Sequence, residues 1–389
     1  MPSVRERIRT IVLPPFDPLN ARAAELRAAG HDVISLGQAV PFFPPPPAAL
    51  AAARAGLERA EINRYVTDPG LPSLRTALAQ QLGPMVAGHL SPHDIGITAG
   101  ANQAFTLVLN TIVDSGDEVI VHAPYFTNHH GAILAAGATP VEAPVADRVS
   151  FAVRWADIEP HVTARTKAVV LCNPSNPTGA PVSASDGIEL VRELRKRDVF
   201  VISDETYMHF VYDGAHWSAA SVEDWRDTVI VIGTFSKSFG MMGWRVGFVL
   251  ADAAICAETV KVQDAMIICA PAISQVAAEA AVREDWSYAL GFRDELRTRR
   301  QILADGLSRI PEVQWTPTAG GLFAFARIAG CDDSTRLAHD LLEQAHIVTI
   351  PGAAFGPAGE GYLRVSYGYA SQAELSEALR RLARFLSHP

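Results

Sequence analysis

The sequence lacks the residue patterns of metal centres, disulfide scaffolds and membrane spans. Its four cysteines, Cys172, Cys256, Cys269 and Cys331, lie far apart, and no C-x-x-C pair or Cys/His cluster is present. This spacing gives no reason to expect a bound metal. The most apolar stretch, residues 265–282, is interrupted by proline, glutamine and glutamate, which favours two buried elements over one membrane span.

The chain also lacks an excess of positive charge. It has 33 lysines and arginines against 42 aspartates and glutamates, a formal net charge of −9. This balance does not favour binding to nucleic acid or to an anionic membrane. The first residues carry mixed charge with no apolar stretch behind them, which argues against a signal peptide. We therefore expect a cytoplasmic protein with small-molecule partners.

What the sequence does contain is a regular alternation of strand and helix patterns. Helical patterns at residues 101–113, 128–136 and 186–196 separate short, β-branched, almost continuously apolar runs. These runs are residues 118–121, 167–171, 199–202 and 229–232. Continuous apolar runs are typical of strands buried on both faces. The pattern predicts an α/β fold with a mostly parallel sheet covered by helices.

A length of 389 residues favours more than one domain. The sequence pattern changes after residue 285, where a long charged helical pattern at 286–309 begins. Shorter strands at 313–315, 322–328 and 362–366 and a final helix at 372–386 follow it. We predict an N-terminal segment (1–46) that packs with a small C-terminal α+β domain (286–389). Residues 47–285 would form the large domain.

A lysine stands in a loop of small residues directly after the strand predicted at 229–232. The segment runs Gly-Thr-Phe-Ser-Lys237-Ser-Phe-Gly-Met-Met-Gly-Trp-Arg245. Open α/β sheets bind ligands at the carboxyl ends of their strands. A lysine there can form an imine if its neutral amine is accessible, and Arg245 could hold a dianion. A surface position for Lys237 and a purely structural role for Arg245 are equally compatible with this segment.

Two further strand ends carry polar residues. Asp204, in Val-Ile-Ser-Asp-Glu-Thr-Tyr207, would face the same crevice as Lys237, and a buried carboxylate needs a cationic or proton-sharing partner. Asn176, in Cys-Asn-Pro-Ser-Asn-Pro-Thr-Gly, could present its amide there. A helix N-cap and a rigid turn are the ordinary alternatives for these two residues.

A glycine turn precedes the helix predicted at 101–113. The segment Thr98-Ala-Gly100-Ala-Asn102 offers free N–H groups and the positive end of a helix dipole, which suit a phosphate. It matches neither the Walker loop nor the G-x-G-x-x-G pattern. Taken alone, it is a weak signal.

In combination these segments resemble the class I/II aminotransferases of the pyridoxal-phosphate (PLP) fold-type I superfamily. The resemblance extends from Gly37 to Arg364, and all the motifs occur in family order. It implies a seven-stranded, mostly parallel sheet with a smaller α+β domain. It also implies PLP as the cofactor, held by Lys237 as a Schiff base.

The resemblance also implies roles for individual residues. Lys237 matches the attachment and proton-shuttling lysine, Asp204 the partner of the pyridine nitrogen, and Tyr207, with Asn176, a donor to the phenolic oxygen. The remaining cofactor-binding residues would be Gly100, Ala101, Asn102, Phe126, Thr234, Ser236, Arg245 and, from a neighbouring subunit, Tyr65. The substrate carboxylate would meet Gly37, Asn176 and Arg364. Phe126 would stack on the ring, with Tyr125 as its rival.

If Tyr65 reaches the neighbouring phosphate, the protein is a homodimer with shared active sites. The substrates would be an L-amino acid and a 2-oxo acid. Asn102 stands where some bacterial aspartate aminotransferases of similar pattern carry lysine, which disfavours a dicarboxylate specialist. The segment Gly37-Gln38-Ala-Val-Pro-Phe-Phe-Pro departs from the usual Gly-x-Pro-x-Phe. His129 is either a group near the ring edge or a surface residue.

The scaffold does not set the reaction, because the same fold hosts several chemistries. The first hypothesis is an aminotransferase. The second is a PLP lyase, cyclase or oxidase acting on an amino acid in a specialised pathway. The third, a non-catalytic regulatory domain, is disfavoured because Lys237, Asp204, Arg245 and Arg364 are all present.

Overall fold

The computed structural model describes residues 4–284 and 286–387 and is built around a seven-stranded sheet. The strand order is β2-β8-β7-β6-β5-β3-β4. The strands are β2 (Ile95–Thr98), β3 (Glu118–Ala123), β4 (Thr139–Pro144), β5 (Thr166–Cys172), β6 (Phe200–Asp204), β7 (Val229–Thr234) and β8 (Gly247–Leu250). The predicted α/β class is confirmed.

Strand direction places the carboxyl ends of six strands together. The sheet is parallel from β4 through β3, β5 and β6 to β7, whereas β8 pairs antiparallel with both β7 and β2. β2 therefore runs in the same direction as β7. The carboxyl ends of all strands except β8 consequently lie at one edge of the sheet, where open α/β sheets bind ligands.

Both faces of this sheet are buried, which explains the continuous apolar runs. Val169 and Val201 point into one core cluster, and their neighbours Val170 and Ile202 point into another. Such alternation between two buried faces needs apolar residues at every position. The helices around the sheet are α3 (Pro47–Leu57), α4 (Pro72–Leu82), α5 (Ala101–Ile112), α6 (Thr127–Ala136), α7 (Trp155–Ile158), α8 (Ala184–Arg195), α10 (Ala253–Ile267) and α11 (Ala272–Arg283).

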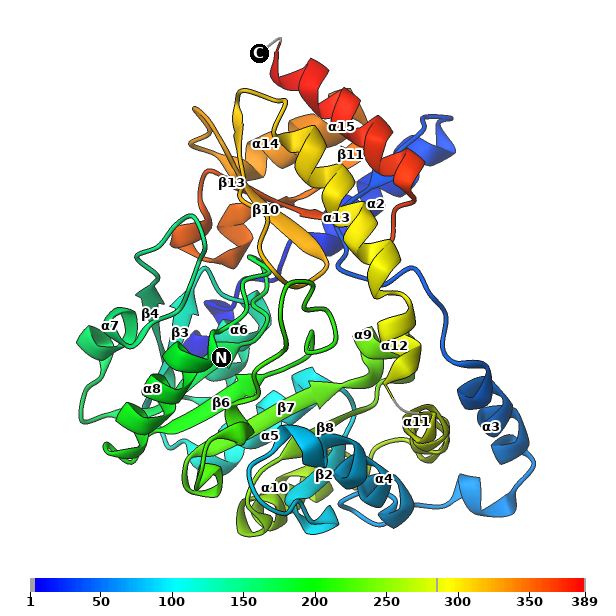
Figure 1. Ribbon diagram of the computed structural model, residues 1–389, viewed down its shortest axis with the longest axis vertical. Helices are drawn as coiled ribbons and strands as arrows, with labels where there is room; N and C mark the ends of the chain where they lie inside the picture. The colour runs from blue at the N-terminus through cyan, green and yellow to red at the C-terminus, as the bar shows by residue number, and fades with distance from the viewer. Residues whose placement is uncertain (1–3, 285, 388–389) are drawn as a thin grey trace.

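A second, antiparallel sheet lies in the upper part of Figure 1, with the order β12-β13-β10-β9. Its strands are β9 (Val313–Gln314), β10 (Phe323–Ile328), β12 (Ile350–Pro351) and β13 (Tyr362–Ser366), and its helices are α13 (Arg293–Leu307), α14 (Ser334–Asp340) and α15 (Gln372–Leu386). A third core cluster fills this part. The upper part also contains α2 (Phe16–Ala28), which lies beside α15 and β11 (Figure 1).

A short parallel pair joins the start of the chain to its end. β1 (Ile34–Ser35) pairs with β11 (Ile347–Val348), and the Leu36 N–H continues the ladder to Val348 O at 2.9 Å. The chain then descends through its proline run to α3 (Figure 1). β1 thus belongs to the upper part, and the segment that follows it leads down to the helices around the large sheet.

The helix expected at residues 286–309 is in fact two helices. α12 (Ser287–Gly291) ends before Phe292, and α13 begins at Arg293. The Phe292 ring stacks on that of Phe43 at 4.3 Å and 9°, so the break presents an aromatic residue to the proline run. The apolar periodicity continues through the break, which is why the sequence prediction was wrong here.

The predicted domain boundaries at residues 46 and 285 stay a prediction, and residue 285 lies outside the described residues. A short helix, α1 (Glu6–Arg9), precedes α2. None of the helices within residues 4–284 and 286–387 is long and apolar enough to cross a membrane.

Candidate active site

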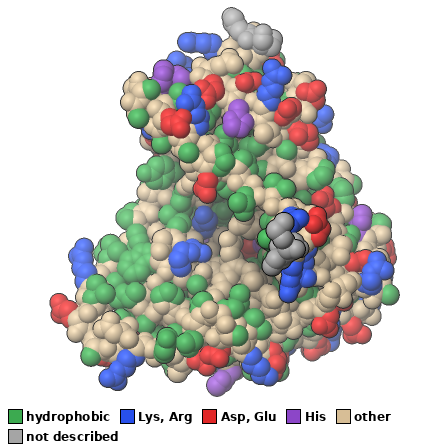
Figure 2. All heavy atoms as spheres, turned by 180° about the vertical axis from the view of Figure 1, so that it is seen from behind, with side chains coloured by type: hydrophobic (Ala, Val, Ile, Leu, Met, Phe, Trp, Pro, Cys, Tyr) green, Lys and Arg blue, Asp and Glu red, His purple; other side chains and the backbone are tan. Residues whose placement is uncertain are grey.

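A cavity of about 390 Å³ opens at the shared carboxyl edge of the large sheet. Its volume lies in the range of small-molecule and cofactor sites. Its lining residues are Phe16, Gln38, Ala39, Val40, Ala101, Asn102, Phe126, Cys172, Asn176, Asp204, Thr206, Tyr207, Thr234, Ser236, Lys237, Met242, Arg245 and Arg364. Figure 2 shows basic side chains (blue) in a hollow on the face seen from behind. The structure thus brings together nearly all the predicted site residues.

Lys237 lies on a one-turn helix, α9 (Phe235–Ser238), directly after β7. Its Nζ donates to the Ala39 carbonyl oxygen at 2.7 Å. Burial, followed by the positive charges of Arg364 and Arg245, lowers the pKa of the Lys237 amine from 10.5 to about 8. Far more of this amine is therefore neutral, and nucleophilic, near neutral pH than of an ordinary lysine, although the protonated form still dominates below about pH 8.

This lowered pKa sets the pH dependence of any reaction of Lys237 with an aldehyde. Below about pH 8 the amine is mostly protonated and cannot attack; above it, the neutral form dominates. We expect the rate at which the cofactor-free protein combines with PLP to rise with pH and level off above a midpoint near 8. Stopped-flow absorbance measures this rate, and a midpoint near 10.5 would contradict the assigned environment.

Asp204 ends β6 and is held by two donors. The Thr206 N–H donates to its Oδ1 at 3.0 Å, and His129 Nε2 lies 3.0 Å from its Oδ2. Burial raises the pKa of the Asp204 carboxyl, but the hydrogen bond and charge of His129, followed by Thr206, outweigh it, so the pKa lies below its usual value. Asp204 therefore presents an ionised carboxylate to the cavity.

Arg245 and the Gly100 turn form a basic corner. The Arg245 guanidinium donates to Met242 O at 2.8 Å and approaches Ser236 Oγ at 3.4 Å. Gly100 has φ +90°, and a Cβ there would lie 2.3 Å from the Arg245 Nη2 atom. The positive φ favours glycine at this position, which lets the guanidinium lie against the N-terminus of α5, where free N–H groups can receive an anion.

Arg364, on β13, is a buried cation that still has room for an anionic partner. Its Nη1 donates to Asn176 Oδ1 at 3.0 Å and its Nη2 to Gly37 O at 2.6 Å, while its buried Nε has no hydrogen bond. Within residues 4–284 and 286–387, no carboxylate forms an ion pair with it. Burial lowers its pKa from 12.5 to about 10. Such a guanidinium is suited to gripping a carboxylate from solution.

The aromatic residues separate into two groups. Phe126 lines the cavity and meets the His129 ring edge-on at 5.3 Å. Tyr125 instead donates its hydroxyl to Glu142 at 2.9 Å, outside this cavity. Tyr207 is buried in the lining, where burial raises the pKa of its hydroxyl well above the usual value. Phe126 is thus the aromatic ring available to a flat ligand.

Three predicted residues do not line the cavity: Gly100, which lies behind it against the Arg245 guanidinium, Gly37 and Tyr65. Gly37 does not line the cavity and contributes through its carbonyl, which accepts from Arg364. Tyr65 lies on the surface with 77% of its area exposed, beside a different hollow. Nothing within this single described chain brings Tyr65 to the cavity.

Several lining residues were missed by sequence reasoning. Phe16, at the start of α2, places its ring 5.3 Å from the Arg364 guanidinium carbon, although it is far away in the sequence. Cys172 and Met242 also line the cavity, and neither was predicted as a site residue. His129, for which the sequence left open a place near the ring edge or on the surface, is buried at 4% exposure and contacts the cavity-lining Asp204.

The comparisons with known proteins agree with this arrangement. The family model described as aminotransferase class I and II matches residues 31–382. The chain belongs to this family. It is 34% identical to an aspartate aminotransferase of Pyrococcus abyssi over 93% of this chain and 94% of that protein. It is 32% identical to an aromatic-amino-acid aminotransferase 2 of Thermococcus litoralis, covering 91% and 92%.

Solved aminotransferase structures have the same fold. An aspartate aminotransferase of Thermotoga maritima superposes with a TM-score of 0.92 at 30% identity, covering 99% of this chain and 100% of that one. The seven-stranded fold of type I predicted from the sequence is confirmed. The protein is a PLP-dependent class I/II aminotransferase, and its substrates are an amino acid and an oxo acid.

The geometry of the cavity fits the cofactor of this family. An aldehyde needs a neutral amine, which Lys237 supplies; a pyridine nitrogen needs an ionised carboxylate, which Asp204 supplies. A phosphate dianion needs a cation with free N–H groups, and the corner around Arg245 offers both. The aminotransferase thus has a partner for the aldehyde, the ring nitrogen and the phosphate of PLP.

Proposed function

We propose that the protein moves the amino group of an L-amino acid with a neutral, aromatic or cationic side chain to a 2-oxo acid. Lys237 would be the attachment point of PLP. The observation that carries this proposal is one cavity lined by Lys237, Arg364 and an ionised Asp204, in which neither Lys237 nor Arg364 forms an ion pair with a carboxylate of residues 4–284 and 286–387. When bound, PLP supplies an electron sink for the negative charge that develops at the substrate Cα.

The chain's own residues orient the substrate and move the proton. Arg364, aligned by Asn176 and the Gly37 carbonyl, would grip the α-carboxylate through a forked contact. Asp204 would hold the proton on the ring nitrogen, because its low pKa keeps it ionised. Lys237, with a pKa of about 8, would take the Cα proton as a general base and, as a general acid, would supply a proton to the former aldehyde carbon of the cofactor.

The other contacts would hold the cofactor in place. Tyr207 and Asn176 would donate to its phenolic oxygen, and Phe126 would stack on its ring. The phosphate would be bound by Gly100, Ala101, Asn102, Thr234, Ser236 and Arg245. Thr234 and Ser236 already share a hydrogen bond at 2.9 Å, which orients both hydroxyls at the start of α9.

The side-chain end of the substrate would meet a largely uncharged surface. Apart from Lys237, Arg245 and Arg364, no lysine or arginine of residues 4–284 and 286–387 lines the cavity. Phe16, Val40 and Met242 contribute apolar surface. A second substrate carboxylate would therefore find no cation of its own in this chain, which disfavours aspartate and glutamate.

An amino-donor panel tests the reaction and the substrate class together. Each donor is incubated with and without 2-oxoglutarate or pyruvate, and the products are identified by mass spectrometry. Transamination requires the oxo acid for sustained turnover. Sustained product without any acceptor would instead indicate a lyase, cyclase or oxidase, which is the alternative that the shared scaffold leaves open.

Replacing Asn102 by lysine should change donor preference. Asn102 is exposed on the first turn of α5 and lines the cavity beside the proposed phosphate site, so the longer side chain of a lysine there would extend past that site toward the substrate. We expect N102K to raise kcat/KM for aspartate by about tenfold, the scale of one added charge-assisted contact, and to lower it for neutral donors. Steady-state kinetics on both donors decide this, and N102Q serves as the uncharged control.

We further propose a homodimer in which Tyr65 reaches the partner's phosphate. Tyr65, Leu57 and Met266 are exposed at 77%, 66% and 52%. In Figure 2 hydrophobic side chains gather at the lower left, on the side of the molecule that carries α3 and α11. Exposed apolar residues gathered in this way are typical of protein interfaces.

A hybrid dimer tests this sharing. In a mixture of refolded K237A and Y65F chains, a hybrid contains one site with native Lys237 from one chain and native Tyr65 from the other. We expect the mixture to regain turnover at PLP concentrations too low to saturate Y65F alone. Activity equal to the sum of the separate variants would contradict a shared site.

We also propose a cytoplasmic location, since the four cysteines are all free thiols. The division into residues 1–46, 47–285 and 286–389 is likewise proposed, and limited proteolysis would test it.

A further inference from the structure

Two buried histidines of the loop after β6 hold the residues that follow Asp204 and Lys237. His216 Nε2 lies 2.9 Å from the Oε2 atom of Glu205, the residue after Asp204. His209 Nδ1 lies 2.7 Å from the Oγ atom of Ser238, the residue after Lys237. The loop between residues 205 and 218 therefore contacts the chain immediately beyond both residues.

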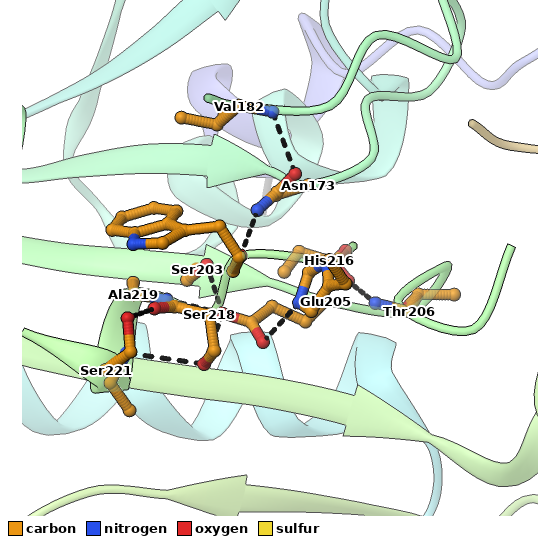
Figure 3. A network of polar contacts seen from close by, with 12 residues as sticks. Asn173, Val182, Ser203, Glu205, Thr206, His216, Ser218, Ala219 and Ser221 are labelled. Atoms are coloured by element: carbon orange, nitrogen blue, oxygen red, sulfur yellow. Dashed lines mark hydrogen bonds and ion pairs between the residues drawn. The ribbon is translucent and has the colours of Figure 1, made fainter. Parts of the chain in front are cut away.

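Glu205 is fully occupied by this loop. Its Oε1 accepts the Ser203 and Ser218 hydroxyls at 2.9 and 3.1 Å and the Ala219 N–H at 3.0 Å (Figure 3). Only 1% of the residue is exposed. Its backbone N–H donates to Ile232 O on β7 at 3.0 Å. The residue that follows Asp204 is thus held in place by the hydrogen bonds of its own buried carboxylate, both oxygens of which have partners.

At the Lys237 end, the contact between His209 and Ser238 joins the same loop to α9. α9 is one turn of four residues, and so short a helix is not stable on its own hydrogen bonds. Ser238 and His209 are 1% and 8% exposed, and the His209 ring packs on Trp286 at 4.2 Å. Burial, followed by the charge of His216, lowers the pKa of His209 to about 3. His209 is thus neutral and its bond to Ser238 persists throughout the working pH range.

We propose that His209 is a positioning residue, which through Ser238 fixes the point from which Lys237 reaches into the cavity. A planar cofactor ring has a fixed distance between its nitrogen and its aldehyde carbon. Asp204 and Lys237 must therefore be held at a matching separation, and a displacement of a fraction of an ångström is costly. One loop anchored behind both residues supplies that constraint. The inference rests on the role of Lys237 proposed above.

A double-mutant cycle tests the contact. S238A removes only the hydroxyl, H209F keeps a ring on Trp286 without the nitrogen, and the double variant removes both. A looser Lys237 would be better hydrated, so we expect the pH midpoint for combination with PLP to rise by about half a unit or more. The rise should be equal in both single variants and the double variant. We expect kcat to fall about 5- to 30-fold with little change in KM.

The conservative H209N variant and a distant serine complete the design. An asparagine places a polar atom near the position of Nδ1, so H209N should recover part of the wild-type midpoint. S334A is the matched control, since Ser334 is also buried and its Oγ accepts the Ala353 N–H at 3.1 Å. We expect S334A to lower the thermal stability while leaving the pH midpoint unchanged.

The inference is overturned if S238A keeps the wild-type midpoint and kcat, or if the two single effects add in the double variant. S238A alone decides the question if H209F does not fold. These results are distinguishable from a failure of the proposed function. An inactive K237A variant together with an unchanged S238A would refute only the role of His209, whereas an active K237A variant would refute the role of Lys237 itself.

Discussion

Replacing Lys237 by alanine is expected to abolish turnover, by about 10⁵-fold or more, the scale seen when an attacking residue is removed. Lys237 is the only lysine among the described residues that line the cavity, and its lowered pKa makes it the available base beside the substrate Cα. The variant should also lose the visible absorbance of lysine-bound cofactor. Steady-state kinetics and an absorbance spectrum measure both effects.

The control for this variant is K261A. Lys261 lies on α10, is 70% exposed and forms an ion pair with Glu258 at 2.7 Å, away from the cavity. It should keep wild-type turnover and spectrum. A K237A variant with normal turnover would end the assignment of Lys237 and of every role that depends on it.

Replacing Asp204 by asparagine is expected to lower kcat by about 10³-fold, the upper range for removing one electrostatic contact. Asparagine fills the same space and can keep the contact with Thr206, so the geometry is retained while the negative charge is lost. Without that charge the ring nitrogen would lose its proton, and with it the electron sink. Single-turnover kinetics with a saturating donor isolate this step.

The matched control is D252N. Asp252 caps α10 by accepting the Ala254 N–H at 2.9 Å, and this N-cap lies outside the cavity. It should leave kcat and stability nearly unchanged, because asparagine caps a helix about as well as aspartate. A fall of less than tenfold in the Asp204 variant would mean that its charge is not what matters at this position.

The central strands were predictable because their surroundings are uniform. β5, β6 and β7 are buried on both faces, so the sequence of each contains a nearly continuous run of apolar residues. β4 was not predicted, since it lies at the sheet edge, contains two prolines and is only partly buried. β2 and β8 have four residues each and were too short to stand out.

The residues of the candidate site likewise divide into those that the sequence indicates and those that depend on tertiary packing. Lys237, Asp204 and Asn176 follow directly from strand ends, where the chain itself indicates the crevice. Phe16 and the Arg364–Gly37 contact depend on how the upper part packs onto the large sheet, and no local pattern encodes that packing. His129 was ambiguous because burial decides between a surface imidazole and a partner for Asp204.

The contact between the early segment and β13 decides which parts of the chain the substrate anchor depends on. Gly37 and Arg364 are separated by 327 positions and yet share a hydrogen bond, and Ser366 donates its N–H to the Leu36 carbonyl beside it. Lys237 and Asp204, in contrast, follow strands of the large sheet. A change that loosens the early segment should therefore weaken the grip on the amino donor more than it weakens the hold on the cofactor.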